Sequence, residues 1–177
     1  MKKVALITGA ARGIGLASAK IFQENGYQVL ILDRDESALN ASAAEFSEAY
    51  PMLFDVSDPQ TGDVIAKEIM DKFGRLDSLV NNAGVASFDP IEKINNETWH
   101  RVMATNLDGV FYLTQAVTPI LKQTKGTIVN ISSISGLRAS TLRVAYGTSK
   151  AAVMQLTKQQ AVELGEYGIR VNAVAPG

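Results

Sequence analysis

The sequence predicts an α/β fold in which helices cover both faces of a parallel, doubly wound sheet. Short apolar runs rich in β-branched residues alternate along the 177-residue chain with longer segments of helical periodicity. Strands that are apolar throughout are typical of parallel sheets buried on both faces. Because the crossovers between such strands are right-handed, the sheet winds in both directions from its centre. A chain of this length supports one sizeable core, so we expect one domain over residues 1–177.

Apolar, β-branched composition predicts six strands, at 4–8, 27–32, 51–54, 76–81, 126–132 and 169–175. Helical patterns lie between them, at 13–25, 36–49, 58–73, around 99–111 and at 146–165. Asn25-Gly26 forms a C-terminal cap for the first helix. Asp58-Pro59 predicts a helix start, because a carboxylate caps free N–H groups and proline fits the first turn. Pro119 is expected to kink or end the fourth helix.

The composition excludes several classes of function. The chain has no cysteine, which excludes disulfides, thiolate nucleophiles and thiolate metal sites. Its single histidine, His100, cannot form a multi-histidine metal site and lies in a polar helix start, so we expect a solvated residue and no metal. A net charge of −1 provides no basic field for nucleic acid. No apolar run suits a membrane helix or a signal peptide, which favours a cytoplasmic protein without a membrane partner.

A glycine-rich loop, TGAARGIG, follows the first predicted strand and opens the first helix. Gly9, Gly13 and Gly15 would permit a tight turn and a close approach to a pyrophosphate, which the free N–H groups of the helix start would bind. The spacing G-x-x-x-G-x-G differs from the general G-x-G-x-x-G pattern. Taken alone, the loop could equally be a plain tight turn.

Asp33 follows the second strand, about 20 residues beyond the loop, where a carboxylate accepts hydrogen bonds from the adenosine ribose. It would also repel a 2′-phosphate, since like unit charges about 4 Å apart cost up to about 4 kcal/mol at an effective dielectric near 20. Asp33 therefore favours NAD over NADP. Arg12 and Arg34 argue the other way, because either could reach a 2′-phosphate. A solvated strand-end residue is the alternative for Asp33, and Arg34 could also be merely solvated.

Tyr146 and Lys150 lie four residues apart at a predicted helix start, on one face of the helix. A phenol is a poor base near neutral pH, but a nearby lysine cation favours its phenolate form. Such a phenol can exchange a proton as an alcohol and a carbonyl interconvert. Without further context, a surface pair would be the simpler interpretation.

Polar residues at two other places provide that context. The strand at 126–132 runs into serines, and Ser132, Ser133 and Ser135 compete to donate to a substrate oxygen. Asn106 interrupts an apolar helix face. It is either a hydrogen-bonded core residue or a member of a proton relay.

Together these motifs resemble the short-chain dehydrogenases/reductases over essentially the whole chain. The resembling motifs, in order, are TGAARGIG, LFDVSD, NNAG, the Asn106 helix, ISS, YGTSK and RVNAVAPG. Each motif alone is a weak signal for the family, whereas the whole set in this order is specific to it. The resemblance implies a Rossmann-like three-layer α/β/α fold, a nicotinamide cofactor, and hydride transfer between that cofactor and a secondary alcohol or ketone.

The resemblance also implies roles for individual residues. The family's serine lies 13 residues before its tyrosine, which selects Ser133, and the catalytic set becomes Asn106, Ser133, Tyr146 and Lys150. Tyr146 would be the acid/base, Lys150 would hold the nicotinamide ribose, and Asn106 would hold a water molecule. The implied cofactor-binding residues are Gly9, Arg12, Gly13, Ile14, Gly15, Asp33, Arg34, Asp55, Val56, Asn82, Ala83, Gly84, Tyr146, Lys150, Pro176 and Gly177.

Members of this family continue beyond the position of Pro176-Gly177, with a lid, helices over the substrate and a seventh strand. We therefore expect a truncated or split chain that lacks the C-terminal strand and lid, with 171–174 as a bare sheet edge. The substrate then stays open among alcohols, polyols, steroids and 3-oxoacyl thioesters. A catalytically inactive dinucleotide-binding or scaffold protein is the alternative. The helix at 146–165 is a common subunit contact in the family, which implies a homo-oligomer, either a dimer or a tetramer.

Overall fold

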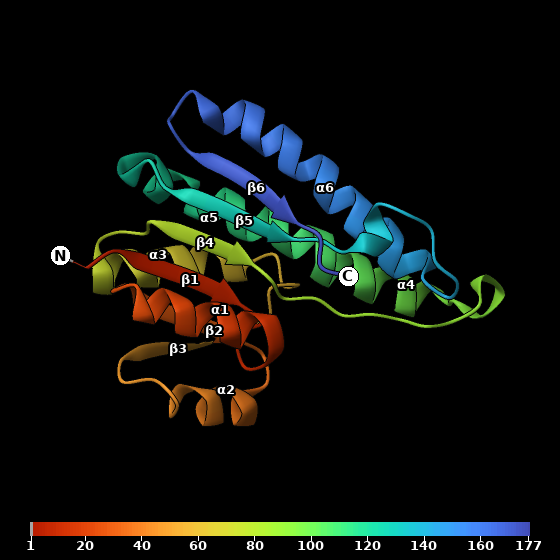
Figure 1. The fold of residues 1–177 in the computed structure, drawn as a ribbon, viewed down its shortest axis with the longest axis horizontal. Coiled ribbons are helices and arrows are strands. Elements are labelled where there is room, and N and C mark those ends of the chain that lie inside the picture. The colour runs from red at the N-terminus through yellow and green to blue at the C-terminus, as the bar shows by residue number, and fades with distance from the viewer. Residues whose placement is uncertain (1) are drawn as a thin grey trace.

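The computed structural model describes residues 2–177 and contains one six-stranded, entirely parallel sheet (Figure 1). The strands are β1 Val4–Thr8, β2 Gln28–Asp33, β3 Ala49–Leu53, β4 Ser78–Asn81, β5 Thr127–Ile131 and β6 Arg170–Val174. Their order is β3-β2-β1-β4-β5-β6, so the chain winds outward in both directions from β1 and β4. The predicted doubly wound parallel sheet is confirmed.

The longer helices are α1 Gly13–Glu24, α2 Glu36–Ala43, α3 Thr61–Phe73, α4 Asn96–Met103, α5 Gly109–Thr124 and α6 Val144–Gly165. A π-helical turn, η2 Ala104–Asp108, joins α4 to α5. Two short 3-10 turns are η1 Ile91–Lys93 and η3 Ile134–Gly136. In the part of the chain that the structure describes, no helix has the length and apolar character that crossing a membrane requires.

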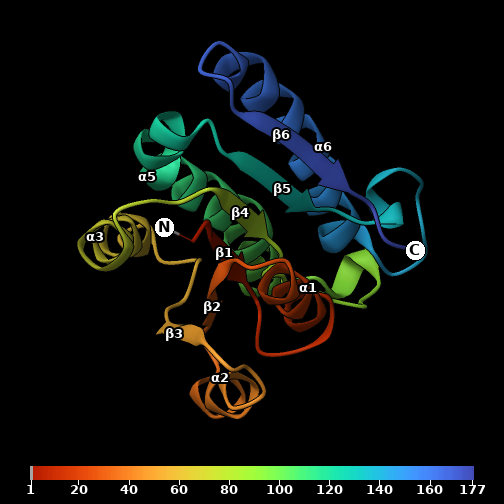
Figure 2. The same cartoon turned by 60° about the vertical axis from the view of Figure 1, so that its left-hand side comes forward.

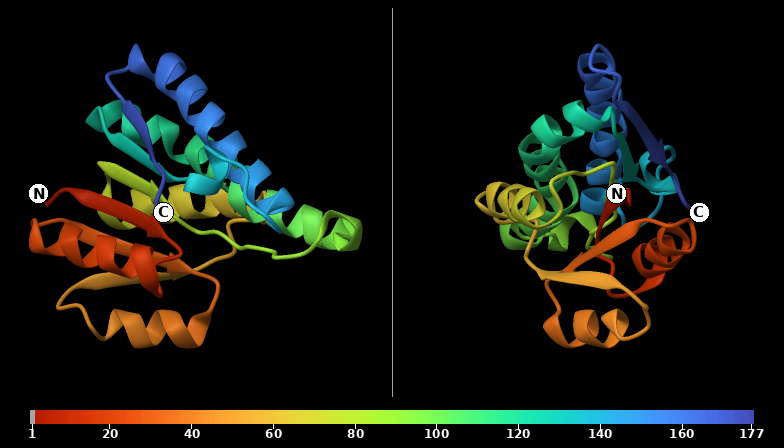
Figure 3. Two further views of the ribbon diagram at one scale, coloured as in Figure 1. Left: turned by 45° about the vertical axis from the view of Figure 1, so that its right-hand side comes forward. Right: turned by 90° about the vertical axis from the view of Figure 1, so that its left-hand side faces the viewer.

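The sheet separates two apolar cores, because successive side chains of a strand point to opposite faces. Leu6 of β1 packs with residues of α3, α5 and α6, whereas Ile7 packs with residues of α1 and α2. Figure 2 and the right panel of Figure 3 show α3 and α5 on the opposite side of the sheet from α1. The three-layer α/β/α arrangement is thereby confirmed.

The prediction of a helix over 36–49 is wrong at its C-terminal end. Helix α2 ends at Ala43, and Ala49 already belongs to β3, where it pairs with Val29 of β2. Helix propensity is a weak preference that tertiary pairing overrides. Strand β3 also contains Pro51, which is tolerated because β3 lies at the edge of the described sheet.

Two further helix predictions also need correction. Helix α3 begins at Thr61 rather than at Asp58, because Asp58 closes a preceding turn, where its carboxylate accepts from the backbone N–H of Gln60 at 2.9 Å. Of the two outcomes expected at Pro119, a kink or an end, the end does not occur, because the helix runs on to Thr124. The carbonyl of Gln115, four residues earlier, loses its intrahelical donor, but both residues are exposed and water can satisfy it.

The strand order fixes where a ligand can bind. Strands β1 and β4 are neighbours. The crossover after β1 leads to β2 on one side of this pair, and the crossover after β4 leads to β5 on the other side. A crevice opens at this point, outside the carboxyl ends of the strands. The C-terminus lies at that same end, while the N-terminus lies at the other (Figure 1).

Candidate active site

A cleft formed by two adjoining cavities runs along the carboxyl end of the sheet. It consists of two cavities of about 480 and 430 Å³, which share Ile14, Asn82, Gly84 and Val85 in their linings. The first, which we name the β2 half, is bounded by the ends of β1, β2 and β3. The second, the α6 half, is bounded by the end of β5, the start of α6 and the C-terminal Pro176-Gly177.

The glycine loop is shaped by close packing as well as by unusual backbone angles. Gly9 has a φ of +62°, and a Cβ there would lie 2.8 Å from the Cα of Ala83. A Cβ on Gly15 would lie only 2.2 Å from the carbonyl oxygen of Gly9. Neither position accepts a side chain without displacing backbone. The loop therefore brings its backbone and the N-terminus of α1 directly against the cleft.

Asn82 joins the glycine loop to the end of β4. Its side-chain amide donates to the carbonyls of Thr8 and Gly9 at 2.9 and 3.0 Å. The hydroxyl of Thr8 in turn accepts from the backbone N–H groups of Asn82 and Ala83 at 3.0 and 2.9 Å. These four bonds hold the two central strand ends in register at the crevice, so Asn82 supports the loop as well as lining the cleft.

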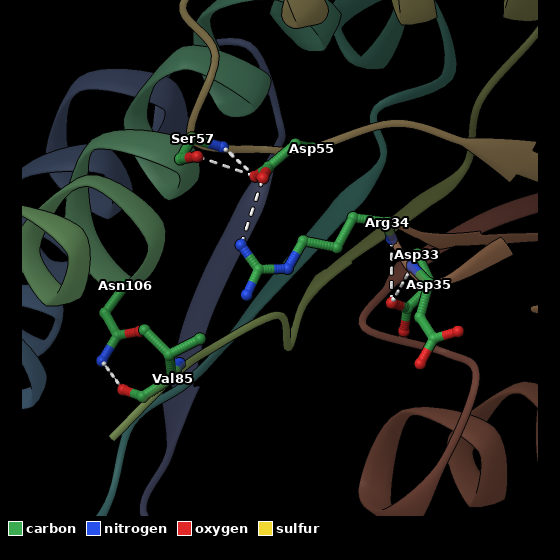
Figure 4. A network of polar contacts seen from close by, with 7 residues as sticks. All are labelled: Asp33, Arg34, Asp35, Asp55, Ser57, Val85 and Asn106. Atoms are coloured by element: carbon green, nitrogen blue, oxygen red, sulfur yellow. Dashed lines mark hydrogen bonds and ion pairs between the residues drawn. The ribbon is translucent and has the colours of Figure 1, made fainter. Parts of the chain in front are cut away.

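Asp33, drawn with its polar contacts in Figure 4, ends β2 and belongs to the lining of the β2 half. One carboxylate oxygen accepts from the backbone N–H groups of Arg34 and Asp35 at 2.8 and 3.2 Å. The other accepts only from Ala11 of the glycine loop, at 3.2 Å. A carboxylate has about four acceptor positions. Asp33 is thus fixed in place and keeps capacity to accept a ligand hydroxyl.

Both arginines of the β2 half are paired with carboxylates. Arg34 reaches Asp55 at 3.2 Å (Figure 4), and Arg12 reaches Asp35 at 2.5 Å. Partial burial alone would raise the pKa of Asp55, but the backbone and hydroxyl of Ser57, together with Arg34, hold it below its usual range. A hydrogen bond from the backbone of Ala38, followed by Arg12, lowers the pKa of Asp35.

Tyr146 and Lys150 lie one turn apart near the start of α6, and both line the α6 half. Lys150 is only 4% exposed, and its ammonium group donates to the carbonyl of Ile131 at 2.7 Å. The ammonium nitrogen lies 5.8 Å from the centre of the Tyr146 ring. Removal from water lowers the pKa of Lys150 to about 8. The pair therefore combines a phenol at the cleft with a buried ammonium group.

Ser132 and Ser133, two of the three candidate serines after β5, differ in what their hydroxyl groups already contact. The hydroxyl of Ser132 donates to the carbonyl of Lys150 at 2.7 Å and is thereby engaged within the protein. The hydroxyl oxygen of Ser133 accepts from the backbone N–H of Ser135 at 3.1 Å, which leaves its own proton free to donate. Both residues line the α6 half. Of these two, Ser133 is the one able to donate to a ligand.

Asn106 lies in the π-helical turn η2 and is completely buried behind the cleft. Its amide accepts from the backbone N–H of Val85 at 2.8 Å and donates to the Val85 carbonyl at 2.9 Å (Figure 4). It also donates to the hydroxyl of Ser149 at 3.0 Å, which donates to the carbonyl of Tyr146 at 2.7 Å. Asn106 thus connects the cleft wall at Val85 to the start of α6.

Most of the site residues expected from the sequence meet in the cleft. The β2 half is lined by Gly9, Arg12, Ile14, Asp33, Arg34, Asp55, Val56, Asn82, Ala83 and Gly84. The α6 half adds Ser133, Tyr146, Lys150, Pro176 and Gly177. Three expected residues, Gly13, Gly15 and Asn106, are not in either lining. His100 is exposed on α4, as expected.

Sequence reasoning missed several lining residues, namely Leu32, Phe54, Val85, Ala86, Thr105, Ile131, Ile134 and Arg143. Most are apolar neighbours of predicted site residues, and nothing in their type distinguishes them from core residues. Arg143 could have been found, because it lies three residues before Tyr146, and this spacing puts both on one side of a helix. Within residues 2–177, no group of three or more His, Asp or Glu side chains is arranged to hold a metal ion.

The fold and its cleft define a Rossmann-like α/β protein, and comparison with known proteins identifies the family. The short chain dehydrogenase family matches residues 3–177. Galactitol 2-dehydrogenase of Agrobacterium fabrum is 40% identical over 99% of this chain and 70% of its own length. The 3-oxoacyl-[acyl-carrier-protein] reductase FabG of Thermotoga maritima is 39% identical over 99% of this chain and 73% of its own length.

Solved structures agree with these relatives. A short-chain dehydrogenase from Streptomyces avermitilis superposes with a TM-score of 0.94 at 34% identity, over 100% of this chain and 66% of its own. An NAD⁺-bound xylitol dehydrogenase gives 0.94 at 35% identity, over 99% of this chain and 70% of its own. This chain belongs to the short chain dehydrogenase family of oxidoreductases, and it spans about 70% of the length of the curated relatives named above.

Proposed function

We propose that this chain carries the cofactor site and the acid/base group of an NAD-dependent enzyme that interconverts a secondary alcohol and a ketone. The observation that carries the proposal is that the two halves of the cleft adjoin. Asp33 and Tyr146 line opposite halves that share Asn82 and Gly84. A single extended dinucleotide could therefore reach from one to the other.

The residues present fit a nicotinamide dinucleotide. The space denied to a Cβ at Gly9 and Gly15 leaves a backbone cradle at the positive end of α1, which suits a pyrophosphate. Asp33 has an acceptor position left for a ribose hydroxyl. When bound, the cofactor supplies the hydride chemistry.

Tyr146 would exchange the proton of the substrate oxygen, and Ser133 would donate a hydrogen bond to the same oxygen. Lys150 would favour the phenolate of Tyr146 and bind the nicotinamide ribose through its ammonium hydrogens. Asn106 would act as a positioning residue through Val85 and Ser149, the contacts that its amide makes. Each role is assigned to the residue that occupies the corresponding position in the family motif.

The charges in and beside the β2 half favour NAD over NADP. Asp33, Asp35 and Asp55 face Arg12 and Arg34, and each arginine is already paired with a carboxylate. A 2′-phosphate would have to break at least one of these pairs and approach Asp33. The NAD⁺-bound xylitol dehydrogenase among the similar structures supports the same choice.

The relatives indicate the type of group that is oxidised or reduced, without a particular substrate. Galactitol and xylitol dehydrogenases and a 3-oxoacyl reductase all act, by name, on an alcohol or oxo group. A homo-oligomer through α6, where Val162 is 83% exposed, belongs to the same proposal. The single domain over 1–177 and the cytoplasmic location expected from the sequence stay predictions.

The decisive experiment replaces Tyr146 with Phe in the full-length protein and measures NADH formation with a panel of secondary alcohols. We expect turnover to fall at least about a hundredfold while the Kd for NAD changes little, because a general acid/base contributes about 10² to 10⁴ in rate. Tyr167→Phe is the matched control, since the Tyr167 ring lies under Lys122 and lines neither half of the cleft. A fully active Tyr146→Phe variant would reject the proposal. NAD binding without turnover by the unaltered protein would support the inactive alternative.

A further inference from the structure

The side chains that line the α6 half of the cleft include two cations and no Asp or Glu. The cations are Lys150 and Arg143. The ammonium group of Lys150 is buried and donates to Ile131. Arg143, at the N-cap of α6, is only half-buried, so its guanidinium is the more exposed of the two charges.

Arg143 differs from the other two arginines of the cleft in having no ionic partner. Arg12 and Arg34 are held by Asp35 and Asp55. Among residues 2–177, the guanidinium of Arg143 makes neither an ion pair nor a side-chain hydrogen bond. An arginine next to a reaction centre without a protein partner is available to an anionic ligand.

Aromatic contacts hold this guanidinium in place. Its central carbon lies 4.2 Å from the ring centre of Phe88 and 5.6 Å from that of Tyr146. Stacking on an aromatic face leaves the N–H edge of a guanidinium free for a carboxylate. The preceding Leu142 has a φ of +59°, which is strained for a bulky residue and sets the direction in which Arg143 leaves the loop.

We propose that Arg143 is a specificity-determining residue that binds a carboxylate of the substrate, which makes the substrate a short hydroxy acid or oxo acid. This inference rests on the proposed function, because it places the reacting oxygen at Tyr146. The guanidinium carbon of Arg143 lies 5.6 Å from the centre of the Tyr146 ring, so the carboxylate and the reacting carbon are separated by only a few bonds. In the oxidation, the hydroxyl proton passes to Tyr146 and the hydride of the same carbon passes to NAD⁺, leaving a C=O bond.

The test compares charged and neutral forms of the same substrate. In the full-length protein, kcat/KM is measured for 2-, 3- and 4-hydroxy acids and for their methyl esters, with NAD⁺. We expect at least one acid to exceed its ester about tenfold or more. In Arg143→Gln, that preference should disappear through a KM for the acid that rises about 10- to 100-fold, the range expected for a lost charge-assisted hydrogen bond. Arg143→Lys should restore part of it.

Arg138→Gln is the matched control, because Arg138 is an exposed arginine of the same loop that lines neither half of the cleft. The ester activity reports on the proposed function separately. If esters and neutral polyols are oxidised while no acid is preferred, the carboxylate inference fails and the proposed function stands.

If no member of the panel is turned over, the affinities of the acid and the ester test the inference instead. The oxo acids and their methyl esters are then titrated into the enzyme–NADH complex, followed by NADH fluorescence. Tighter binding of an acid that disappears in Arg143→Gln supports the inference. Equal binding of acid and ester, or no binding of either, overturns it.

Discussion

The side chain of Asn106 and the backbone of Val85 form a two-way hydrogen-bonded pair, with distances of 2.8 and 2.9 Å. The side-chain amide of Asn106 accepts from the N–H of Val85 and donates to its C=O. A paired β-strand would satisfy the same two backbone groups. This pair fixes the cleft wall at the point that both halves share. It also explains why a polar residue interrupts an otherwise apolar helix face.

Replacing Asn106 with Ala should lower the free energy of unfolding by about 2–3 kcal/mol, because it leaves the N–H and C=O of Val85 without partners. The Kd for NAD should rise as well, since Val85 lines the cleft. Chemical denaturation and a cofactor titration measure the two effects. Asn40→Ala, at an exposed position of α2, should change stability by no more than about 0.5 kcal/mol. An Asn106→Ala variant as stable as Asn40→Ala would contradict this assignment.

Gly15→Ala should impair cofactor binding by displacing the glycine loop. The new methyl group would lie 2.2 Å from the carbonyl oxygen of Gly9, and the loop backbone cannot move without leaving the cleft. We expect the Kd for NAD to rise about tenfold or more, which corresponds to about 1.4 kcal/mol. Gly165→Ala, in α6 with open space around it, should be neutral or slightly stabilising. Equal cofactor affinity in the two variants would show that the loop is not a cradle.

The stability of the cofactor-free protein should rise with pH above neutrality because of Lys150. Its pKa is about 8 in the folded protein, against an ordinary value of 10.5. Between these values the unfolded chain binds more protons than the folded one, so raising the pH favours folding. From pH 7.5 to 9.5 the gain is on the order of 2 kcal/mol. Urea titrations across this range measure it, and the gain should vanish in Lys150→Met. A pH-independent difference between the two proteins would contradict the burial argument.

Asp33 should decide the choice between the two dinucleotides. In Asp33→Ser, the ratio of Kd for NADP to Kd for NAD should fall about tenfold or more, since relief of about 1.4 kcal/mol of repulsion is tenfold in affinity. Glu36→Gln removes one negative charge from an exposed position nearby that lines neither half of the cleft. Its ratio should stay close to that of the unaltered protein. A similar fall in both variants would indicate a general charge effect in place of a contact.

Hydropathy and turn residues were sufficient to predict the sheet, because apolar strands and glycine or aspartate at their ends are local signals. They failed where a tertiary contact decides the local structure. The alanine-rich segment after Glu36 has helical propensity throughout, yet pairing with Val29 converts Ala49 into strand. Asp58 resembles a helix cap in sequence, but it closes the turn before α3.

The residues of the candidate site likewise fall into those that the sequence could select and those that it could not. Tyr146, Lys150 and Asp33 could be selected because their residue types and spacing carry chemistry. Ser132, Ser133 and Ser135 could not be ranked without the family spacing, since what distinguishes Ser132 from Ser133 is the hydrogen bond from Ser132 to the carbonyl of Lys150. The spacing of Arg143 from Tyr146 was a sequence signal for its place in the site, but its lack of an ionic partner is visible only in the structure.

The central claim is that one dinucleotide spans both halves of the cleft, and a crystal structure of the full-length protein with NAD⁺ tests it most directly. We predict the adenosine beside Asp33 and Asp55, the pyrophosphate at the start of α1, and the nicotinamide ring beside Tyr146 and Ser133. A cofactor bound in the opposite direction, or one whose nicotinamide lies away from Tyr146, would contradict the account.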